Sequence, residues 1–100
     1  MYYSDETIIQ IWQKAQYVSP ENEARGFRKD ECGAWIKLSD YGNRDSPYGW
    51  EIDHIFPQSL GGSDELYNLR PLHWENNIEK AGRPYLSCAV TSDGTSNYQI

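Results

Sequence analysis

The segment that decides the fold is residues 52–83, IDHIFPQSLGGSDELYNLRPLHWENNIEKAGR. It opens with Ile52 and Ile55, which flank the titratable pair Asp53 and His54 as in a buried strand. Burying such a pair is costly unless a partner or a bound ion satisfies it. Either the pair is a structural accident, or the chain is built to present it at a site.

The residues around this pair follow the order strand, loop, strand and helix. Residues 50–55 predict a strand, and two adjacent glycines mark the loop after it, with a short helical turn over 64–67. Residues 69–73 predict a second strand, which its proline confines to a sheet edge. Residues 74–81 predict a helix that ends at Gly82.

Short elements added to this segment predict a single α+β domain over residues 1–100, which is too short for a second core. Residues 5–18 place apolar side chains on one face and predict an amphipathic helix. Residues 33–38 predict a short strand, and the polar run before Asp30 predicts a loop. The Gly-, Ser- and Asn-rich residues 91–100 predict a mobile or loosely docked tail.

The segment resembles the signature of the HNH endonucleases, DHI-x-P-x-S-x-GG-x-x-x-x-x-NL-x-x-L-x-x-x-x-N-x-x-K. Its fixed positions occur in order and without gaps. The resemblance implies a ββα-metal (HNH) core over about residues 50–83, with the helix over 5–18 added to it. It also implies metal-dependent hydrolysis of phosphodiester bonds, with DNA as the favoured substrate and 5′-phosphate and 3′-hydroxyl products.

The resemblance assigns a role to each polar position of the motif. His54 becomes the general base that activates water, Asp53 a metal ligand, and Asn68 a structural residue that holds the loop near His54. Asn77 becomes the second metal ligand, at a spacing from His54 similar to that in RNA-guided effector nucleases, while the neighbouring Asn76 stays an alternative. Imidazole can accept a proton near neutral pH, and oxygen ligands suit Mg²⁺, Mn²⁺ or another divalent cation. Adjacent strand residues face opposite sides, so the strand must end or bend at the pair for both to serve one site.

Basic residues near the motif are the candidate contacts to a nucleic acid. Lys80 lies one helical turn beyond the second proposed ligand, and Arg70, Arg83 and Lys37 are weaker candidates. The net charge of −6 is awkward for a nucleic-acid binder, because phosphate affinity comes largely from Lys and Arg. The negative charge makes nucleic-acid binding less expected but does not exclude it.

The two cysteines, Cys32 and Cys88, lie far apart without CxxC spacing, and we predict ordinary thiols without a shared role. Many members of the resembled family carry two CxxC pairs that bind a structural zinc. In this chain the corresponding second pair is His73 and Asn76, and the first retains at best Cys32. A structural zinc site with four cysteines is therefore not expected.

Rival interpretations stay open at the level of sequence. An isolated histidine in a strand is more often an ordinary residue than a catalyst, and a helix-surface amide or lysine is common. The chain could be an inactive nucleic-acid-binding module or a protein-interaction domain of the same fold. The joint presence of Asp53, His54, Asn68 and Asn77 favours the enzyme.

No apolar run is long enough to span a bilayer and the start lacks a signal-peptide pattern, so the default compartment is the cytoplasm. The sequence does not predict whether a protein partner or a homodimer exists.

Overall fold

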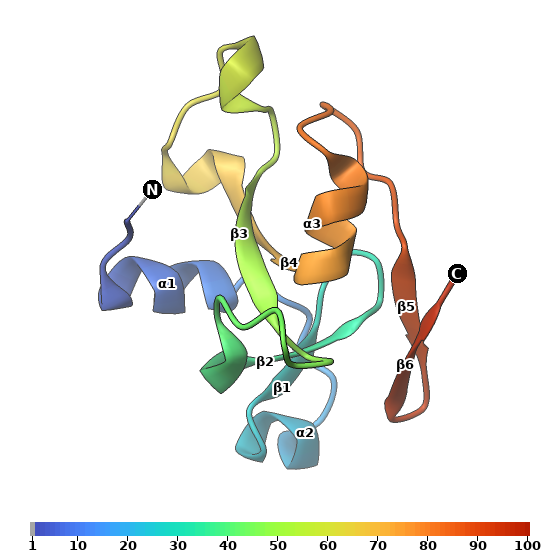
Figure 1. Cartoon of the computed structure of the whole chain (residues 1–100). Coiled ribbons are helices and arrows are strands. Elements are labelled where there is room, and N and C mark those ends of the chain that lie inside the picture. The colour runs from blue at the N-terminus through green and yellow to red at the C-terminus, as the bar shows by residue number, and fades with distance from the viewer. Residues whose placement is uncertain (1) are drawn as a thin grey trace.

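The computed structural model describes residues 2–100, a mixture of helices and strands that confirms the α+β class (Figure 1). The α-helices are α1 (Asp5–Trp12), α2 (Pro20–Ala24) and α3 (Trp74–Lys80). The strands are β1 (Phe27–Lys29), β2 (Trp35–Lys37), β3 (Trp50–His54), β4 (Leu69–His73), β5 (Val90–Asp93) and β6 (Ser96–Gln99). They pair as three separate antiparallel sheets, β1 with β2, β3 with β4, and β5 with β6. No helix among the described residues is long and apolar enough to cross a membrane.

The predicted order of strand, loop, strand and helix is present as β3, a long connection, β4 and α3. Opposite one another in the register of β3 and β4 stand Asp53 and Arg70, then His54 and Leu69. The connection carries short 3₁₀ turns at Gln58–Leu60 and Leu66–Asn68. The second begins two residues after the start of the turn predicted over 64–67. The first of these turns, Gln58–Leu60, projects away from the other elements, the second lies near α1, and α3 lies beside β3 (Figure 1).

Local capping explains where α3 begins and ends. Nδ1 of His73 accepts a hydrogen bond from the backbone N–H of Glu75, which caps the first turn. At the other end Ala81 adopts a left-handed conformation, with φ of 53°, and Gly82 follows with φ of 73°. The helix therefore stops just before the predicted glycine, because Ala81 takes the left-handed position that glycine usually occupies.

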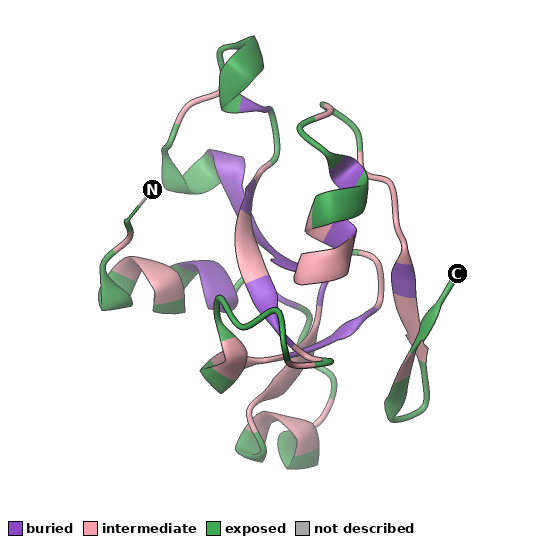
Figure 2. Ribbon diagram, in the orientation of Figure 1, coloured by how far each residue is buried: buried purple, intermediate pink, exposed green. Residues whose placement is uncertain are grey.

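Helix α1 is shorter than predicted, ending at Trp12 instead of residue 18. Its apolar face still packs as expected, since Ile11 and Trp12 are buried in the core with Trp50 and Leu69. The helix cannot continue because the backbone of Gln16 pairs with Lys29 in an isolated β-bridge. Figure 2 shows the buried positions at the end of α1 and along β2 and β4.

Two segments predicted to be irregular are ordered elements. The polar run after α1 contains α2 and β1, and residues 91–100 belong mostly to the β5–β6 hairpin instead of a mobile or loosely docked tail. Asn97 in β6 fixes this hairpin to β2. Its side chain accepts a hydrogen bond from the N–H of Trp35 at 2.7 Å and donates one to the carbonyl oxygen of Trp35 at 2.9 Å. Polar side chains of the kind that predicted a mobile tail therefore hold the hairpin against β2.

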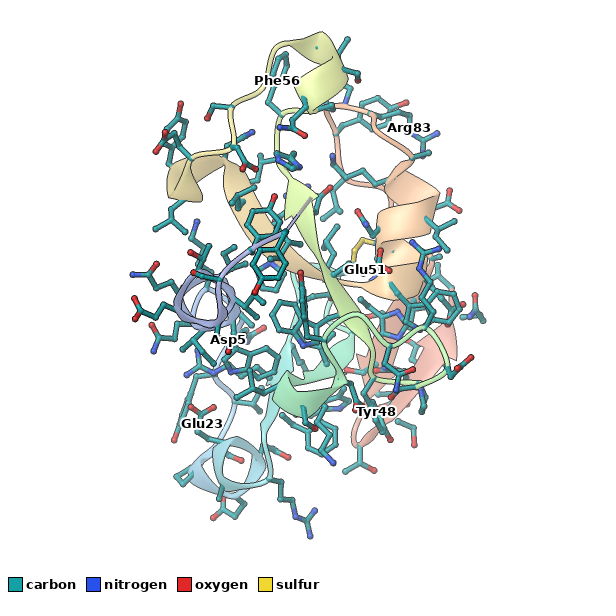
Figure 3. All side chains as sticks on the ribbon, turned by 60° about the vertical axis from the view of Figure 1, so that its left-hand side comes forward. Asp5, Glu23, Tyr48, Glu51, Phe56 and Arg83 are labelled. Carbon is teal, nitrogen blue, oxygen red and sulfur yellow. A yellow bond between two sulfur atoms is a disulfide. The ribbon has the colours of Figure 1, made fainter. Side chains whose placement is uncertain are left out.

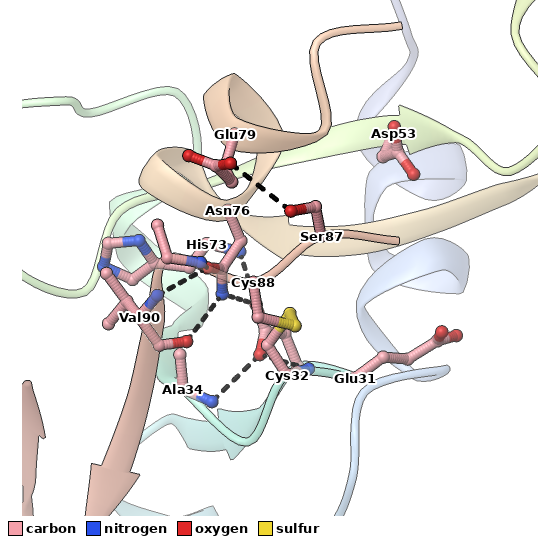
Figure 4. The surroundings of a disulfide bond; sticks show 12 residues. Glu31, Cys32, Ala34, Asp53, His73, Asn76, Glu79, Ser87, Cys88 and Val90 are labelled. Carbon is pink, nitrogen blue, oxygen red and sulfur yellow. Dashed lines mark hydrogen bonds between the residues drawn. A yellow bond between two sulfur atoms is a disulfide. The ribbon is translucent and has the colours of Figure 1, made fainter. Parts of the chain in front are cut away.

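The prediction of two ordinary thiols is wrong, because Cys32 and Cys88 form a disulfide with a Cα–Cα distance of 5.7 Å (Figure 4). The bond joins the turn before β2 to the segment before β5. The turn is held further by Asp30, whose Oδ1 accepts hydrogen bonds from the backbone N–H groups of Cys32 and Ala34. A separation of 56 residues hid this pairing from local sequence patterns.

Candidate active site

A cleft at the end of β3 brings together the proposed base and both proposed metal ligands. It is lined by Ile52, Asp53, His54, Pro57, Gln58, Ser59, Asn77, Lys80 and Gly82. Figure 3 shows Glu51 pointing toward α3, Phe56 in the projecting loop and Arg83 past the end of α3. Because β3 ends at His54, the neighbouring side chains of Asp53 and His54 both reach this cleft.

Asp53 is buried between two cations. Its Oδ2 lies 2.8 Å from Nε of Arg70, and its Oδ1 lies 3.2 Å from Nζ of Lys80. Arg70 continues the network to Glu31, with 2.8 Å between Nη1 and Oε2. These pairs offset the cost of burying the carboxylate, which is 6% exposed.

The same network places Arg70 and Lys80 differently from the expectation that both contact phosphate. Arg70 is 7% exposed and Lys80 is 1% exposed. Lys80 also donates to the backbone oxygen of His54 at 2.9 Å. Their charges are directed into the protein, where they hold Asp53 and the end of β3, so the structure does not present them as surface cations.

Asn77 faces the cleft with its carbonyl oxygen available. Its Nδ2 donates to Oε1 of Glu51 at 2.9 Å. A carboxylate only accepts hydrogen bonds, so the amide nitrogen must face Glu51 and the carbonyl oxygen must point away. Among residues 2–100 no hydrogen bond engages that oxygen. Glu51 and Asp53 lie two residues apart on the same face of β3, which explains why α3 meets both.

Glu51 is itself held by Arg44, at 2.5 Å from Nε and 2.9 Å from Nη2. Burial alone would raise the pKa of Glu51, but the hydrogen bonds from Arg44 and Asn77 outweigh it and lower the pKa. Glu51 therefore stays ionised near neutral pH and keeps the Asn77 amide in one orientation.

Asn76, the alternative ligand, points away from the cleft and is completely buried (Figure 4). Its Nδ2 donates to Oδ2 of Asp30 and to the carbonyl oxygen of Val90, each at 3.0 Å. Its Oδ1 accepts from the N–H groups of Ala89 and Val90, each at 2.8 Å. All of its hydrogen-bonding groups join α3 to the turn before β2 and to β5. Of the two asparagines, only Asn77 lies in the cleft.

Asn68 ties the projecting loop at both of its ends. Its side chain accepts from the N–H of Phe56 at 2.8 Å and donates to the carbonyl oxygens of Phe56 at 3.0 Å and Ser63 at 2.7 Å. Gly62 makes this closure possible, because a Cβ atom there would lie 1.8 Å from the carbonyl oxygen of Phe56. These hydrogen bonds hold the loop that follows His54.

The side chain of His54 belongs to a chain of two contacts that the sequence did not predict. Its Nε2 lies 2.8 Å from Oδ1 of Asp64, and the same oxygen accepts a hydrogen bond from the hydroxyl of Tyr3 at 2.8 Å. The bond from His54, followed by the bond from Tyr3, lowers the pKa of Asp64. Burial, and then the bond to Asp64, raises the pKa of the Tyr3 hydroxyl. Asp64 sits at a variable position of the motif and Tyr3 lies far outside it, so spacing gave no signal for either.

The remaining candidate contacts lie away from the buried pair. Arg83 follows Gly82, the last residue of the cleft lining. Its Nη2 donates to the carbonyl oxygen of Glu79 at 2.6 Å, and its guanidinium stacks over Tyr85. Lys37 lies in β2 over the ring of Phe27 and does not line the cleft. Neither side chain lines the cleft, although Arg83 directly follows Gly82, which does.

The donor set of the cleft fits a hard divalent cation. Asp53 offers carboxylate oxygens, which can accept further contacts besides those from Arg70 and Lys80, and Asn77 offers a carbonyl oxygen. Mg²⁺ is commonly held by one or two protein oxygens, with water and substrate phosphate completing its coordination. Within residues 2–100 no group of three or more His, Cys, Asp or Glu side chains could hold a metal, so any ion here depends on this mixed pair.

Comparison with known proteins identifies the family of the chain. The family model described as HNH endonuclease matches residues 30–81, a span that includes β3, β4 and α3. No curated protein and no solved structure matches the chain. The matched span covers more than half of the sequence and contains Asp53, His54, Asn68 and Asn77. The chain therefore belongs to the HNH endonuclease family.

Proposed function

We propose that the protein is a metal-dependent endonuclease that hydrolyses phosphodiester bonds of DNA. Residues 1–100 form one nuclease domain, in which β3, β4 and α3 make the ββα-metal core and α1 is an added helix. The observation that carries the proposal is the cleft that holds Asp53, His54 and Asn77 within the span matched by the family. An inactive binding module would not need these three groups at one cleft.

His54 acts as the general base. Its side chain is 19% exposed at the end of β3, which leaves it accessible to water while the backbone is held by Lys80. Asp64 engages Nε2, so Nδ1 is the ring atom left to accept a proton from water. General-base catalysis of this kind contributes about 10²- to 10⁴-fold to a rate.

Asp53 and Asn77 would hold Mg²⁺, Mn²⁺ or another divalent cation. When bound, such an ion would supply positive charge to neutralise the charge that develops on the phosphate and on the leaving 3′ oxygen, consistent with 5′-phosphate and 3′-hydroxyl products. The chain's own part is to fix these two ligands, through Arg70 and Lys80 on one side and Glu51 on the other. Asn68 supports the site through the loop that follows the base.

The substrate must be held by few cations, because the net charge is −6 and both Arg70 and Lys80 are buried. Arg83, next to Gly82 of the cleft lining, is the proposed phosphate contact, and Lys37 would act only at a distance from the cleft. A weak electrostatic contribution predicts modest DNA affinity with a shallow dependence on salt.

The test is cleavage of plasmid and single-stranded DNA by purified protein with Mg²⁺ or Mn²⁺. Wild type should nick DNA, and both EDTA and His54→Ala should abolish nicking while circular dichroism stays unchanged. Asn77→Ala should retain the fold and lose most of the activity. A wild type without cleavage, or a His54→Ala variant as active as wild type, would contradict the proposal.

The disulfide bears on the compartment in which the nuclease works. Such bonds persist in oxidising environments and are rare in the cytosol, so Cys32–Cys88 counts against the cytoplasm favoured by the sequence. Alkylation of free thiols in freshly lysed cells decides between the two. An unmodified pair supports an oxidising compartment, and two modified cysteines support the cytoplasm.

A further inference from the structure

The imidazole of His54 is fixed in one tautomer by its neighbour. Nε2 lies 2.8 Å from Oδ1 of Asp64. An ionised carboxylate can only accept a hydrogen bond, so Nε2 must carry the hydrogen. In the neutral ring this leaves Nδ1 without a proton and able to accept one. A hydrogen-bond acceptor next to one ring nitrogen thus makes the other ring nitrogen the one that can accept a proton.

Asp64 needs a second support to serve in this way. Its side chain is 42% exposed, and an exposed ion pair alone holds its partners weakly. The second support is Tyr3, whose hydroxyl donates to the same Oδ1 at 2.8 Å. Tyr3 is half-buried and packs against the hydrophobic core, so its position does not depend on the loop that carries Asp64.

The loop and the N-terminal segment are each anchored independently. On the loop side, Asn68 donates to the carbonyl oxygen of Ser63 at 2.7 Å, and its own N–H donates to the carbonyl oxygen of Glu65 at 2.8 Å. Asp64 therefore lies between two tied positions. On the other side, Ser4 caps α1 by accepting a bond from the N–H of Thr7, which fixes the chain directly after Tyr3.

We propose that Asp64 is a positioning residue for His54, and that Tyr3, from outside the family-matched residues 30–81, holds Asp64 in place. The N-terminal segment is thereby part of the active site. This inference rests on the proposed role of His54 as general base. The tyrosine and the aspartate act through His54 and not on the substrate; they hold the ring so that Nδ1 is the nitrogen left to accept a proton.

The first test reads the tautomer without DNA, metal or activity. Protein labelled with ¹⁵N-histidine is studied by long-range ¹H–¹⁵N NMR at about pH 8, where free imidazoles are neutral. The chain contains only two histidines. His73 is an internal reference, since its Nδ1 accepts from Glu75 and its Nε2 lies 2.8 Å from the carbonyl oxygen of Pro47.

The expected spectrum shows both rings in the Nε2–H form in wild type. Asp64→Ala should move His54 toward a mixture of tautomers and leave the signals of His73 unchanged. Asp64→Asn, which retains an acceptor, should restore much of the wild-type pattern. A His54 ring that is already a mixture in wild type, or that does not respond to Asp64→Ala, would overturn the inference.

The second test separates positioning from binding. Asp64→Ala should lower kcat about 10- to 100-fold, with KM for DNA nearly unchanged, as is typical for loss of an orienting partner. Tyr3→Phe should lower kcat about 2- to 10-fold, as expected for one lost hydrogen bond. Tyr67→Phe is the matched control, because that hydroxyl contacts Ser63 in the same loop and not Asp64.

The two tests also distinguish this inference from the proposed function. If Asp64 sets the tautomer but wild type cleaves no DNA, the nuclease assignment fails, while the role of Asp64 in fixing the ring of His54 stands. If wild type cleaves DNA and Tyr3→Phe behaves like Tyr67→Phe, the role of Tyr3 is overturned while the nuclease assignment stands.

Discussion

Lys80 Nζ donates to the backbone oxygen of His54 at 2.9 Å and lies 3.2 Å from Oδ1 of Asp53. A single buried cation from α3 thus holds the proposed base through its backbone and the proposed metal ligand through its side chain. In the fully desolvated position of Lys80, which is 1% exposed, both contacts are needed to offset the cost of burying the charge. The lysine of the family signature therefore acts in this chain as a clamp between helix and strand.

Lys80→Met should lower the free energy of unfolding by about 3–5 kcal/mol, because it removes one partner of a buried ion pair and leaves Asp53 with Arg70 alone. Urea denaturation measures the effect. Lys37→Met is the matched control, since Lys37 is half-buried in β2 and forms only a cation–π contact with Phe27; it should cost less than about 1 kcal/mol. Equal losses in the two variants would show that Lys80 is not a clamp.

The adjacent asparagines should separate stability from metal binding. Asn76→Ala removes one of the hydrogen bonds of Asp30, the bond to the carbonyl oxygen of Val90 and the acceptor of the Ala89 and Val90 N–H groups, and should cost about 2 kcal/mol or more. Asn77→Ala removes one part-buried hydrogen bond to Glu51. Because Arg44 still holds Glu51, this change should alter stability by less than about 1 kcal/mol.

Titration calorimetry with Mn²⁺ completes this comparison. Asn77→Ala should weaken binding of the ion by at least 10-fold, whereas Asn76→Ala should bind it normally at temperatures where it remains folded. Normal Mn²⁺ affinity in Asn77→Ala would remove Asn77 from the set of ligands.

Local patterns sufficed for the elements around the site and failed where contacts are distant in sequence. The strand ending at His54 and the helix after His73 follow from periodicity and capping, and motif spacing brought Asn77 to the cleft. Whether Arg70 faces solvent or Asp53 depends on packing, which spacing does not encode. The pairing of Tyr3 with Asp64 spans 61 residues and has no local signature.

The missed hairpin has a different physical cause. Residues 91–100 are polar, and polarity with Gly and Asn usually marks a loop. Here the backbone groups pair within the hairpin, and Asn97 bonds Trp35 across to β2, so hydrogen bonds replace apolar burial. Only the tertiary partner reveals that these groups are satisfied.

Reduction of Cys32–Cys88 should lower the free energy of unfolding by about 2–5 kcal/mol, because the bond closes a long loop in the unfolded chain. Urea midpoints of wild type with and without dithiothreitol measure the loss. The double variant Cys32→Ser/Cys88→Ser should match reduced wild type and should not respond to the reductant. A wild type that is equally stable in both conditions would contradict a stabilising disulfide.

The same reduction should reach the cleft through neighbouring contacts. Glu31 follows the anchored residue Asp30 and precedes Cys32, and it pairs with Arg70, which in turn holds Asp53. Reduced protein that remains folded should therefore bind Mn²⁺ more weakly than oxidised protein, by calorimetry. Glu31→Gln in the oxidised protein is the control that weakens the Glu31–Arg70 pair without touching the disulfide, and it should show a smaller change of the same sign.

The contact between Asp64 and His54 should appear in the pH dependence of stability. The pKa of Asp64 is lowered from 3.8, first by the bond from His54 and then by the bond from Tyr3. A carboxyl whose pKa is lower in the folded state contributes stability above the unfolded pKa, and this contribution is lost as pH falls through the folded pKa. Asp64→Asn should therefore be less stable than wild type at pH 6, and the difference should shrink steadily below about pH 3.8.

Chemical denaturation of both proteins at pH 6 and at pH 3 measures this difference. Other carboxyls with lowered pKa values, such as Glu51, titrate in both proteins and cancel in the comparison. Glu65→Gln, a change in an exposed neighbour in the same loop, should track wild type at both pH values. A gap between wild type and Asp64→Asn that is the same at pH 3 as at pH 6 would mean that the carboxylate charge does not stabilise the contact with His54. The positioning role would then rest on the neutral hydrogen bond alone.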